Sequence, residues 1–453
     1  MSTTFKSINP YSGNLIKEYK AHTKDQVHQM LDKSDAVFKE WRKKDLAEKS
    51  ELIRKVGELL EERKQEYGNL ITDEMGKPIS ESIAEIEKCA WLCEFYAVNA
   101  EDFLADEVID TEAEESFISY DPLGCILAVM PWNYPFWQVM RFAAPTLTAG
   151  NVALLKHASN VSGCAVALQE LFVDAGYPDG CFQTLLTDHD VIEDIIANKT
   201  VKAVTLTGST KAGQAIASIA GKNLKKTVLE LGGSNACIVW EDADLDQYID
   251  VMVKARMQNT GQSCIAAKRF IVVQDIYDQF MEAFVSKVKS LKKGDPADKD
   301  TEVGVMARED LAEELEKQVE KSIKKGAEVT VGNTRNKAFY APTILTEVKP
   351  GMTAFDEEIF GPVASVIKAK DREESIALAN QTDFGLGTML FTESVDDALH
   401  LTGEIEDGAF FINEMVKSDP RLPFGGTKGS GYGRELSKEG ILEFVNKKTV
   451  YIK

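Results

Sequence analysis

The spacing of apolar residues changes character along the chain, and its first stretch is helical. Over residues 24–106 apolar positions recur at helical intervals, most clearly in residues 52–60. This spacing places the apolar side chains on one face of a helix. Residues 76–78, Gly-Lys-Pro, interrupt the pattern, because proline and glycine both disfavour a helix interior. We therefore expect a helical region with one break.

The pattern becomes strand-like at "SFISYDPLGCILAVM". Two apolar runs flank Asp121-Pro122-Leu123-Gly124, where proline in second place and glycine in fourth place suit a type I turn. The pattern predicts a hairpin. Such a hairpin would either protrude and pair with another subunit or remain an ordinary internal hairpin.

From residue 151 onward, strands and helices alternate. The strands are expected at residues 151–156, 201–208, 227–233 and 236–240, and the helices at residues 160–176, 209–221 and 242–258. The alternation continues with helices near residues 278–291, 309–326, 372–380 and 395–405 and with strands at 363–369, 387–391 and 409–413. Strands that alternate with helices form parallel sheets covered on both faces. We therefore expect an α/β protein.

Composition and charge narrow the class of protein. The length of 453 residues allows two or three domains. The net charge of −21 repels phosphate backbones, so we expect no nucleic-acid partner. No apolar run has the length of a membrane span or a signal peptide, which predicts a cytoplasmic protein without membrane contact. The seven cysteines are odd in number and scattered, which favours reduced thiols over disulfides or a metal site.

Gly208 and Ser209 stand where a predicted strand meets a predicted helix, in "VTLTGSTKAGQAIA". The first N–H groups of a helix lack acceptors, and the helix dipole favours an anion there. Glycine lets the backbone approach a ligand, and serine caps the helix or binds a phosphate oxygen. The segment therefore suits a dinucleotide pyrophosphate, or it is a capped turn without a ligand. It is neither a G-x-G-x-x-G loop nor a Walker A loop.

Three further side chains become reactive only in the right surroundings. Asn133 lies between two prolines in "VMPWNYPFW", and a stiff amide is a good oxyanion donor; a turn asparagine is the alternative. Glu230 lies in a short apolar strand, where a desolvated carboxylate serves as a general base, unless it faces solvent. Cys264 in "NTGQSC" is a nucleophile if backbone N–H groups lower its pKa, and otherwise an inert core thiol.

Taken together and in this order, these segments resemble the aldehyde dehydrogenase superfamily. The resemblance also includes "LLKHAS", "EEIFGPV" and "PFGGTKGSGYGRE" and covers nearly the whole chain. The pattern is most similar to the bacterial succinate-semialdehyde dehydrogenases that use NAD(P)+. The resemblance implies two doubly wound parallel-sheet domains and a small β oligomerisation arm. It assigns residues 1–114 and 133–232 to a dinucleotide-binding domain, 233–428 to a catalytic domain, and 115–132 and 429–453 to the arm.

The resemblance also implies a mechanism. Cys264 would attack the aldehyde carbon, and the Asn133 amide and the Cys264 backbone N–H would hold the resulting oxyanion. Hydride would pass to NAD(P)+, which leaves a thioester that Glu230 would hydrolyse through a water molecule. A carboxylate and backbone dipoles would then replace the histidine of other cysteine enzymes.

The cofactor is expected to be NADP, with NAD also accepted. The implied cofactor residues are Trp132, Lys156, His157, Ser159, Gly208, Ser209, Leu231, Glu358 and Phe360. Ser159 stands where strictly NAD-using relatives carry glutamate. A glutamate would repel a 2′-phosphate, whereas serine donates a hydrogen bond to it and Lys156 pairs with it.

The substrate is expected to be succinate semialdehyde or a similar small aldehyde. Arg141, Ser418 and Arg421 match positions that bind or face the substrate carboxylate in such relatives. Gln258 departs from the pattern, because some relatives carry a second arginine there. This departure leaves other aldehydes open, such as glutarate semialdehyde or glycolaldehyde.

Two other readings of the chain and its assembly complete the expectations. A coenzyme-A-acylating reaction is disfavoured by Glu230, because a hydrolytic base would destroy the thioester. A catalytically inactive nucleotide-binding scaffold is the alternative from another class.

The hairpin and the strand-like residues 447–453 are expected to form a homodimer or homotetramer.

Overall fold

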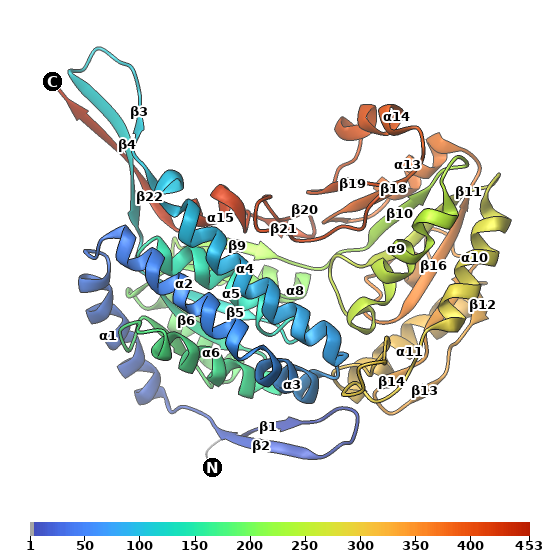
Figure 1. The fold of residues 1–453 in the computed structure, drawn as a ribbon, viewed down its shortest axis with the longest axis horizontal. Helices are drawn as coiled ribbons and strands as arrows, with labels where there is room; N and C mark the ends of the chain where they lie inside the picture. The colour runs from blue at the N-terminus through green and yellow to red at the C-terminus, as the bar shows by residue number, and fades with distance from the viewer. Residues whose placement is uncertain (1–3) are drawn as a thin grey trace.

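The computed structural model of this protein describes residues 4–453. Figure 1 shows two lobes, one built from the first half of the chain and one from the second, and an arm of strands that projects from the first lobe. A two-stranded hairpin of β1 (Thr4–Ile8) and β2 (Leu15–Lys20) lies at the N-terminal end.

The N-terminal region is helical, as its apolar spacing predicts. It consists of α1 (Lys24–Trp41), α2 (Leu46–Glu62), α3 (Lys64–Met75) and α4 (Ile79–Leu104). Thr23 and Gln26 form a reciprocal capping box at the start of α1. Gly76 ends α3 with φ 75°, a left-handed conformation that glycine adopts without strain, and Pro78 precedes α4. The break predicted at residues 76–78 is therefore confirmed.

The first lobe is built around a six-stranded sheet with the order β21-β9-β8-β5-β6-β7. Its strands are β5 (Cys125–Met130), β6 (Val152–His157), β7 (Phe182–Thr184), β8 (Val201–Thr207), β9 (Lys226–Glu230) and β21 (Gly431–Tyr432). Its covering helices include α5 (Trp137–Thr148), α6 (Ser162–Asp174), α7 (Ile192–Ala197) and α8 (Thr210–Lys222). All strands except β21 are parallel. From β5 the chain adds β6 and β7 on one side, and it then adds β8 and β9 on the other side of β5. Open α/β sheets bind ligands at such a switch point, which here lies between β5 and β8.

The second lobe contains a seven-stranded sheet with the order β12-β15-β16-β11-β10-β18-β19. Its strands are β10 (Asn235–Val239), β11 (Ala267–Val273), β12 (Glu328–Val331), β15 (Thr343–Thr346), β16 (Val363–Ala369), β18 (Thr388–Phe391) and β19 (Phe410–Ile412). Its helices are α9 (Leu245–Met257), α10 (Tyr277–Ser290), α11 (Glu309–Lys324), α12 (Thr353–Asp356), α13 (Arg372–Asn380) and α14 (Val395–His400). Separate apolar clusters cover the two faces of this sheet. Neighbouring residues of β10 therefore alternate between them, with Cys237 in one cluster and Ile238 in the other.

Short elements complete the two lobes. They are the 3₁₀ turns η1 (Ser159–Val161), η2 (His189–Val191), η3 (Gln258–Gly261) and η4 (Leu401–Gly403), the strand pairs β13 (Arg335–Asn336) with β14 (Phe339–Tyr340) and β17 (Phe384–Gly385) with β20 (Thr427–Lys428), and helix α15 (Ser437–Leu442).

The arm consists of three antiparallel strands, and the predicted hairpin is wrong. In the arm, β4 (Glu115–Pro122) pairs with β22 (Val445–Ile452) and with β3 (Glu107–Val108). The run after the turn, β5, instead enters the six-stranded sheet between β6 and β8. The arm boundaries of 115–132 and 429–453 are therefore too wide, because both β5 and β21 belong to the sheet. Local turn chemistry does not decide which strand becomes the partner.

Candidate active site

A cavity of about 250 Å³ opens at the carboxyl ends of three neighbouring strands of the six-stranded sheet. It is lined by Pro131, Trp132 and Asn133 after β5, by Thr207, Gly208 and Ser209 at the end of β8, by Leu231 and Gly232 after β9, and by Gln138, Cys264, Glu358 and Phe360. Because β5 and β8 flank the point where strand order reverses, this is the position expected for a nucleotide.

The entrance to α8 is built to receive an anion. Ser209 caps this helix by accepting a hydrogen bond from the Ala212 N–H at 3.3 Å. A methyl group at Gly208 would find its nearest neighbour, Leu206 Cδ2, at 3.6 Å, so the backbone here is open. The Thr207 hydroxyl is buried without a hydrogen-bond partner in residues 4–453. A polar group without a partner beside a helix N-terminus fits a phosphate oxygen.

Glu358 lies on the opposite wall of the cavity, and its carboxylate lies close to the backbone of Gly232 and Gly233. Its Oε1 accepts hydrogen bonds from the Gly233 N–H and from Lys268 Nζ, both at 3.0 Å. A methyl group at Gly232 would lie 2.5 Å from Glu358 Oε2, so a side chain there would displace the Glu358 carboxylate. Phe360 meets the Trp132 ring edge-on, with 5.8 Å between ring centroids. Together these groups form a narrow slot with one aromatic wall.

Three of the expected cofactor residues lie outside this cavity. Lys156 is buried, and its ammonium lowers the pKa of the nearby His189. His157 is also buried and accepts a hydrogen bond from the Ala158 N–H through Nδ1, while its Nε2 lies 2.9 Å from the Pro135 carbonyl oxygen. Burial lowers the pKa of His157 to about 4. The neutral ring therefore ties β6 to the loop that carries Asn133. Ser159 is exposed.

A second cavity of about 240 Å³ shares Cys264 and Gln138 with the first. Its lining residues are Glu81, Ala84, Glu85, Lys88, Tyr134, Trp137, Gln138, Arg141, Lys254, Gln258, Ser263, Cys264, Ile265, Met415, Val416, Lys417, Ser418 and Phe424. Cys264 therefore separates a nucleotide-type cavity from a chamber with several cationic side chains. A reacting sulfur between two such cavities is in contact with both of their occupants.

The loop before Cys264 has a strained backbone. Asn259, Thr260 and Gly261 adopt positive φ values of 55°, 53° and 71°, and a β-branched residue with such a φ is a genuine outlier. The Asn259 N–H donates to Glu81 Oε2 at 2.7 Å, and the Ala307 N–H donates to Gln262 Oε1 at 2.9 Å. These contacts hold a conformation that the isolated loop would avoid, which is typical of functional sites.

The Cys264 side chain is a thiol in the chain as it stands. Burial raises its pKa to about 11, and the Lys268 ammonium is the leading influence in the opposite direction. Lys268 is fully buried and donates to the carbonyl oxygens of Ser263 at 2.7 Å and Cys264 at 2.6 Å as well as to Glu358. The Lys268 ammonium thus connects the loop that carries Cys264 to the Glu358 carboxylate, which lines the nucleotide-type cavity.

Asn133 is held so that one amide hydrogen stays available. Its Nδ2 donates to the Gln262 carbonyl oxygen at 3.1 Å, which uses one of its two hydrogens. Its main-chain oxygen accepts from Asn259 Nδ2 at 2.8 Å. Both Asn133 and Cys264 line the nucleotide-type cavity, and the second amide hydrogen of Asn133 has no acceptor among the described residues.

Glu230 is the last residue of β9 and is buried, so it does not face solvent. Both of its carboxyl oxygens lack hydrogen-bond partners in residues 4–453. Burial, with the nearby Glu435, raises the pKa of Glu230 well above its usual range, and Arg141 opposes this shift. Its charge also raises the pKa of Cys264, so the two groups are near neighbours. Glu230 lines neither cavity, however.

The three expected substrate residues have different surroundings. Arg141 lines the chamber, but its Nε lies 2.5 Å from Glu435 Oε2, so its charge already has a partner. Ser418 lines the chamber and is buried. Arg421 does not line it; its guanidinium binds both oxygens of Asp419 at 2.7 and 2.8 Å and lies over the Trp91 ring.

Sequence reasoning missed Lys88, which lines the chamber, and Lys268, which contacts the Cys264 loop and Glu358. Lys88 lies on α4 and lines the chamber, although a lysine in a helical pattern reads as a solvent-facing residue. Lys268 is the second residue of β11, the strand after Cys264, and is fully buried. The only sequence signal for Lys268 was its position in an apolar strand. A lysine buried there requires hydrogen-bond acceptors around it.

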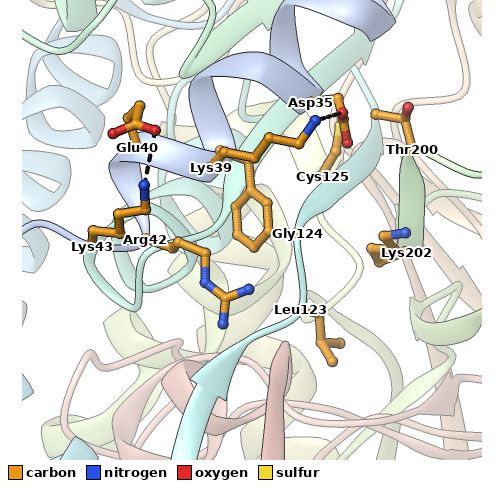
Figure 2. Close-up of a pocket in the computed structure, with 11 residues that line it drawn as sticks. Asp35, Lys39, Glu40, Arg42, Lys43, Leu123, Gly124, Cys125, Thr200 and Lys202 are labelled. Atoms are coloured by element: carbon orange, nitrogen blue, oxygen red, sulfur yellow. Dashed lines mark hydrogen bonds and ion pairs between the residues drawn. The ribbon is translucent and has the colours of Figure 1, made fainter.

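A third, larger hollow of about 720 Å³ shares no residue with the other two. Figure 2 shows Lys39 turned toward Asp35 and Lys43 toward Glu40 at the end of α1, with Nζ–carboxylate distances of 2.7 and 2.9 Å. Burial raises the pKa of the thiol there, Cys125, to about 12. Arg42 and Lys202 also line the hollow and take part in none of the ion pairs of residues 4–453, so only two of its four cations are neutralised by a carboxylate.

No helix within residues 4–453 is long and apolar enough to cross a membrane. In the same residues no group of three or more histidine, cysteine, aspartate or glutamate side chains is arranged to hold a metal ion.

Comparisons with known proteins agree on one family. The model of the "Aldehyde dehydrogenase family" matches residues 1–450. The chain is 50% identical over 449 residues to "Probable succinate-semialdehyde dehydrogenase (NADP+)" of Synechocystis sp., covering 98% of this chain and 99% of the relative. It is 45% identical over 448 residues to the succinate semialdehyde dehydrogenase (NAD(P)+) of Escherichia coli, covering 98% and 97%. It is similar in structure, with a TM-score of 0.97 and 37% identity over 99% of each chain, to the succinic semialdehyde dehydrogenase of Streptococcus pyogenes in complex with NADP+.

Proposed function

Because this chain belongs to the aldehyde dehydrogenase family, we propose that it oxidises succinate semialdehyde to succinate. It is an NAD(P)-dependent enzyme that oxidises aldehydes. The observation that carries the proposal is the position of Cys264 between two cavities, one suited to a dinucleotide and one rich in cations. The names of the relatives support the choice of substrate.

The first chemical step forms a carbon–sulfur bond. The Cys264 thiol first loses its proton to water, and the thiolate then attacks the aldehyde carbon while the carbonyl electron pair moves to oxygen. The free hydrogen of Asn133 Nδ2 and the Cys264 backbone N–H then stabilise this oxyanion. A donor already aimed before charge develops costs no reorganisation during the step, which is why the Gln262 contact that fixes the Asn133 amide matters.

When bound, NAD(P)+ would supply the hydride acceptor, and Cys264 would then hold the acyl group as a thioester. Glu230 takes a proton from water, and the oxygen of that water attacks the thioester carbon. The thiolate leaves and the carboxylic acid is released. The raised pKa of Glu230 makes its carboxylate a stronger base for this water.

NADP is the expected cofactor, and the residues present fit its phosphate groups. The open backbone at Gly208, the cap at Ser209 and the unpartnered Thr207 hydroxyl suit the pyrophosphate. We assign the 2′-phosphate to Lys156 and Ser159, with His189 beside Lys156. The relatives that use NADP(+) or NAD(P)+ support this preference.

The assembly and location are further parts of the proposal. Strand β22 lies at the edge of the three-stranded arm, with Tyr451 and Ile452 exposed. An unpaired edge strand with exposed apolar side chains is available to a second copy of the chain, so we propose a homo-oligomer built through this arm. Seven unpaired cysteines fit a reducing compartment, and we place the protein in the cytoplasm.

An absorbance screen of the purified protein tests the reaction. Succinate semialdehyde, glutarate semialdehyde, glycolaldehyde and butanal are each supplied with NADP+ or NAD+, and formation of reduced cofactor is followed. We expect the highest kcat/KM with succinate semialdehyde and NADP+, with free succinate as the product whether or not coenzyme A is present. A higher kcat/KM for a neutral aldehyde would refute the substrate, and a coenzyme A thioester product would refute the hydrolytic reaction.

A further inference from the structure

Lys88 is a cation in the chamber without a counter-anion. It is partly buried, and its Nζ donates to Ser418 Oγ at 3.0 Å and lies 4.2 Å from the centroid of the Trp137 ring. None of the ion pairs among residues 4–453 includes Lys88. A desolvated ammonium with a single neutral acceptor leaves two hydrogens free, and it lacks the partner that buried charges normally have.

The serine beside it also has an unused donor. Ser418 Oγ accepts hydrogen bonds from Lys88 Nζ and from Trp137 Nε1, both at 3.0 Å. With both lone pairs engaged, the hydroxyl hydrogen has no acceptor among the described residues. Ser418 is buried in the chamber wall. An ammonium and a hydroxyl donor therefore lie side by side in the wall of a chamber that Cys264 also lines.

The other cations of the chamber are less suited to an anion. The Arg141 guanidinium is paired with Glu435, and Lys417 is exposed and paired with Glu414 at 2.8 Å. Lys254 is exposed to solvent. Water screens an exposed ammonium and a neighbouring carboxylate neutralises a paired one, so both bind an added anion weakly.

We propose that Lys88 and Ser418 together bind the carboxylate at the far end of the substrate, and that Lys88 thereby makes the enzyme selective for aldehydes that carry a terminal carboxylate. The inference rests on the proposed function, since it takes the aldehyde end to be at Cys264. The Lys88 ammonium supplies the charge and the Ser418 hydroxyl supplies a directed hydrogen bond, which are the two contacts that a carboxylate accepts best.

The titration of Lys88 supports this role. Burial and the neighbouring Arg141 lower its pKa to about 8, while Cys89, Asp419 and Glu85 act in the opposite direction. Below pH 8 the side chain is charged and attracts a carboxylate; above pH 8 it becomes neutral and loses that attraction. The preference for a carboxylated over a neutral aldehyde therefore falls as the pH rises through this region.

The experiment compares kcat/KM for succinate semialdehyde with kcat/KM for butanal, which has the same number of carbons and no charge. We expect Lys88→Met to lower this ratio at least tenfold and Lys88→Arg to restore most of it. Lys417→Met removes a chamber lysine that already has a partner and should change the ratio less than threefold. Inhibition of butanal oxidation by succinate is measured in parallel, and its inhibition constant should rise at least tenfold in Lys88→Met.

An unchanged ratio in Lys88→Met, or an equal fall in the Lys417→Met control, overturns the inference. If Lys88→Met does not fold, the wild-type ratio is measured between pH 6 and 10 instead, and a ratio that stays constant overturns it equally. Failure of the proposed function looks different, because the wild-type protein itself would then fail to oxidise succinate semialdehyde with either cofactor.

Discussion

Replacement of Lys268 by methionine tests how the reactive sulfur is tuned. Lys268 Nζ donates to two carbonyl oxygens of the Cys264 loop and to Glu358, at 2.6 to 3.0 Å, and is fully buried. Methionine has a similar length and no charge, so the variant removes the ammonium without opening a large cavity. The same substitution removes the leading influence that lowers the pKa of Cys264, which burial already raises to about 11.

The magnitude follows from the contacts. A nearby opposite charge typically lowers the pKa of an acid by about 1–3 units. We expect the pKa of Cys264 to rise by at least about one unit in Lys268→Met, which makes the thiolate fraction at any pH below the pKa about tenfold smaller. Breaking a buried ion pair costs about 3–5 kcal/mol, and the partial exposure of Glu358 reduces this to roughly 2–3 kcal/mol of unfolding free energy.

The assay is the rate of Cys264 alkylation by iodoacetamide between pH 7 and 10, measured by mass spectrometry of the modified peptide. Urea unfolding of the same variants gives the loss of stability. Lys268→Arg keeps the positive charge and serves as the control, with an alkylation rate close to that of the wild type. Equal or faster alkylation in Lys268→Met, with a folded protein, would refute the electrostatic role of Lys268.

Three further predictions concern the proposed chemistry. Asn133→Ala should lower kcat about 10²–10³-fold with little change in KM, because only the developing oxyanion needs its donor; a change confined to KM would contradict this. Glu230→Gln should still give one rapid equivalent of reduced cofactor per subunit and then turn over about 10²–10⁴-fold more slowly, as stopped-flow absorbance would record, since only hydrolysis needs the base; loss of the rapid phase would count against the role. Ser159→Glu should lower kcat/KM for NADP+ at least about tenfold relative to NAD+ in steady-state kinetics, by repulsion of the 2′-phosphate; an unchanged ratio would move the phosphate site elsewhere.

Much of the site was predictable because it follows strands whose apolar pattern is strong. The runs now seen as β8 and β9 were predicted as strands of a parallel sheet, whereas the run now seen as β5 was predicted as one strand of a hairpin. Only the resemblance brought Asn133 and Gly208 into one site, because neither segment was specific alone. The order of the motifs added what periodicity lacked, namely the family and its nucleophile.

The missed features depend on contacts between residues distant in the chain. The turn at residues 121–124 predicted a hairpin, but β4 found its partner in β22, more than three hundred residues later. Arg141 was expected to be free for a substrate, whereas Glu435 from the C-terminal segment lies against its guanidinium. His157 contacts the backbone of the Asn133 loop, which its place in the sequence did not predict, and its assignment to the cofactor stays a prediction.

The sequence by itself determined most helices and strands and the order of the candidate reactive segments, because periodicity, turn residues and motifs are local properties of the chain. The tertiary structure alone decided which charges are neutralised, as at Arg141, and which remain unpaired, as at Lys88. It also decided that the pKa of Cys264 and of Glu230 would rise. The reason is physical: desolvation and Coulomb interaction depend on distances in space, which the spacing of residues along a chain does not set.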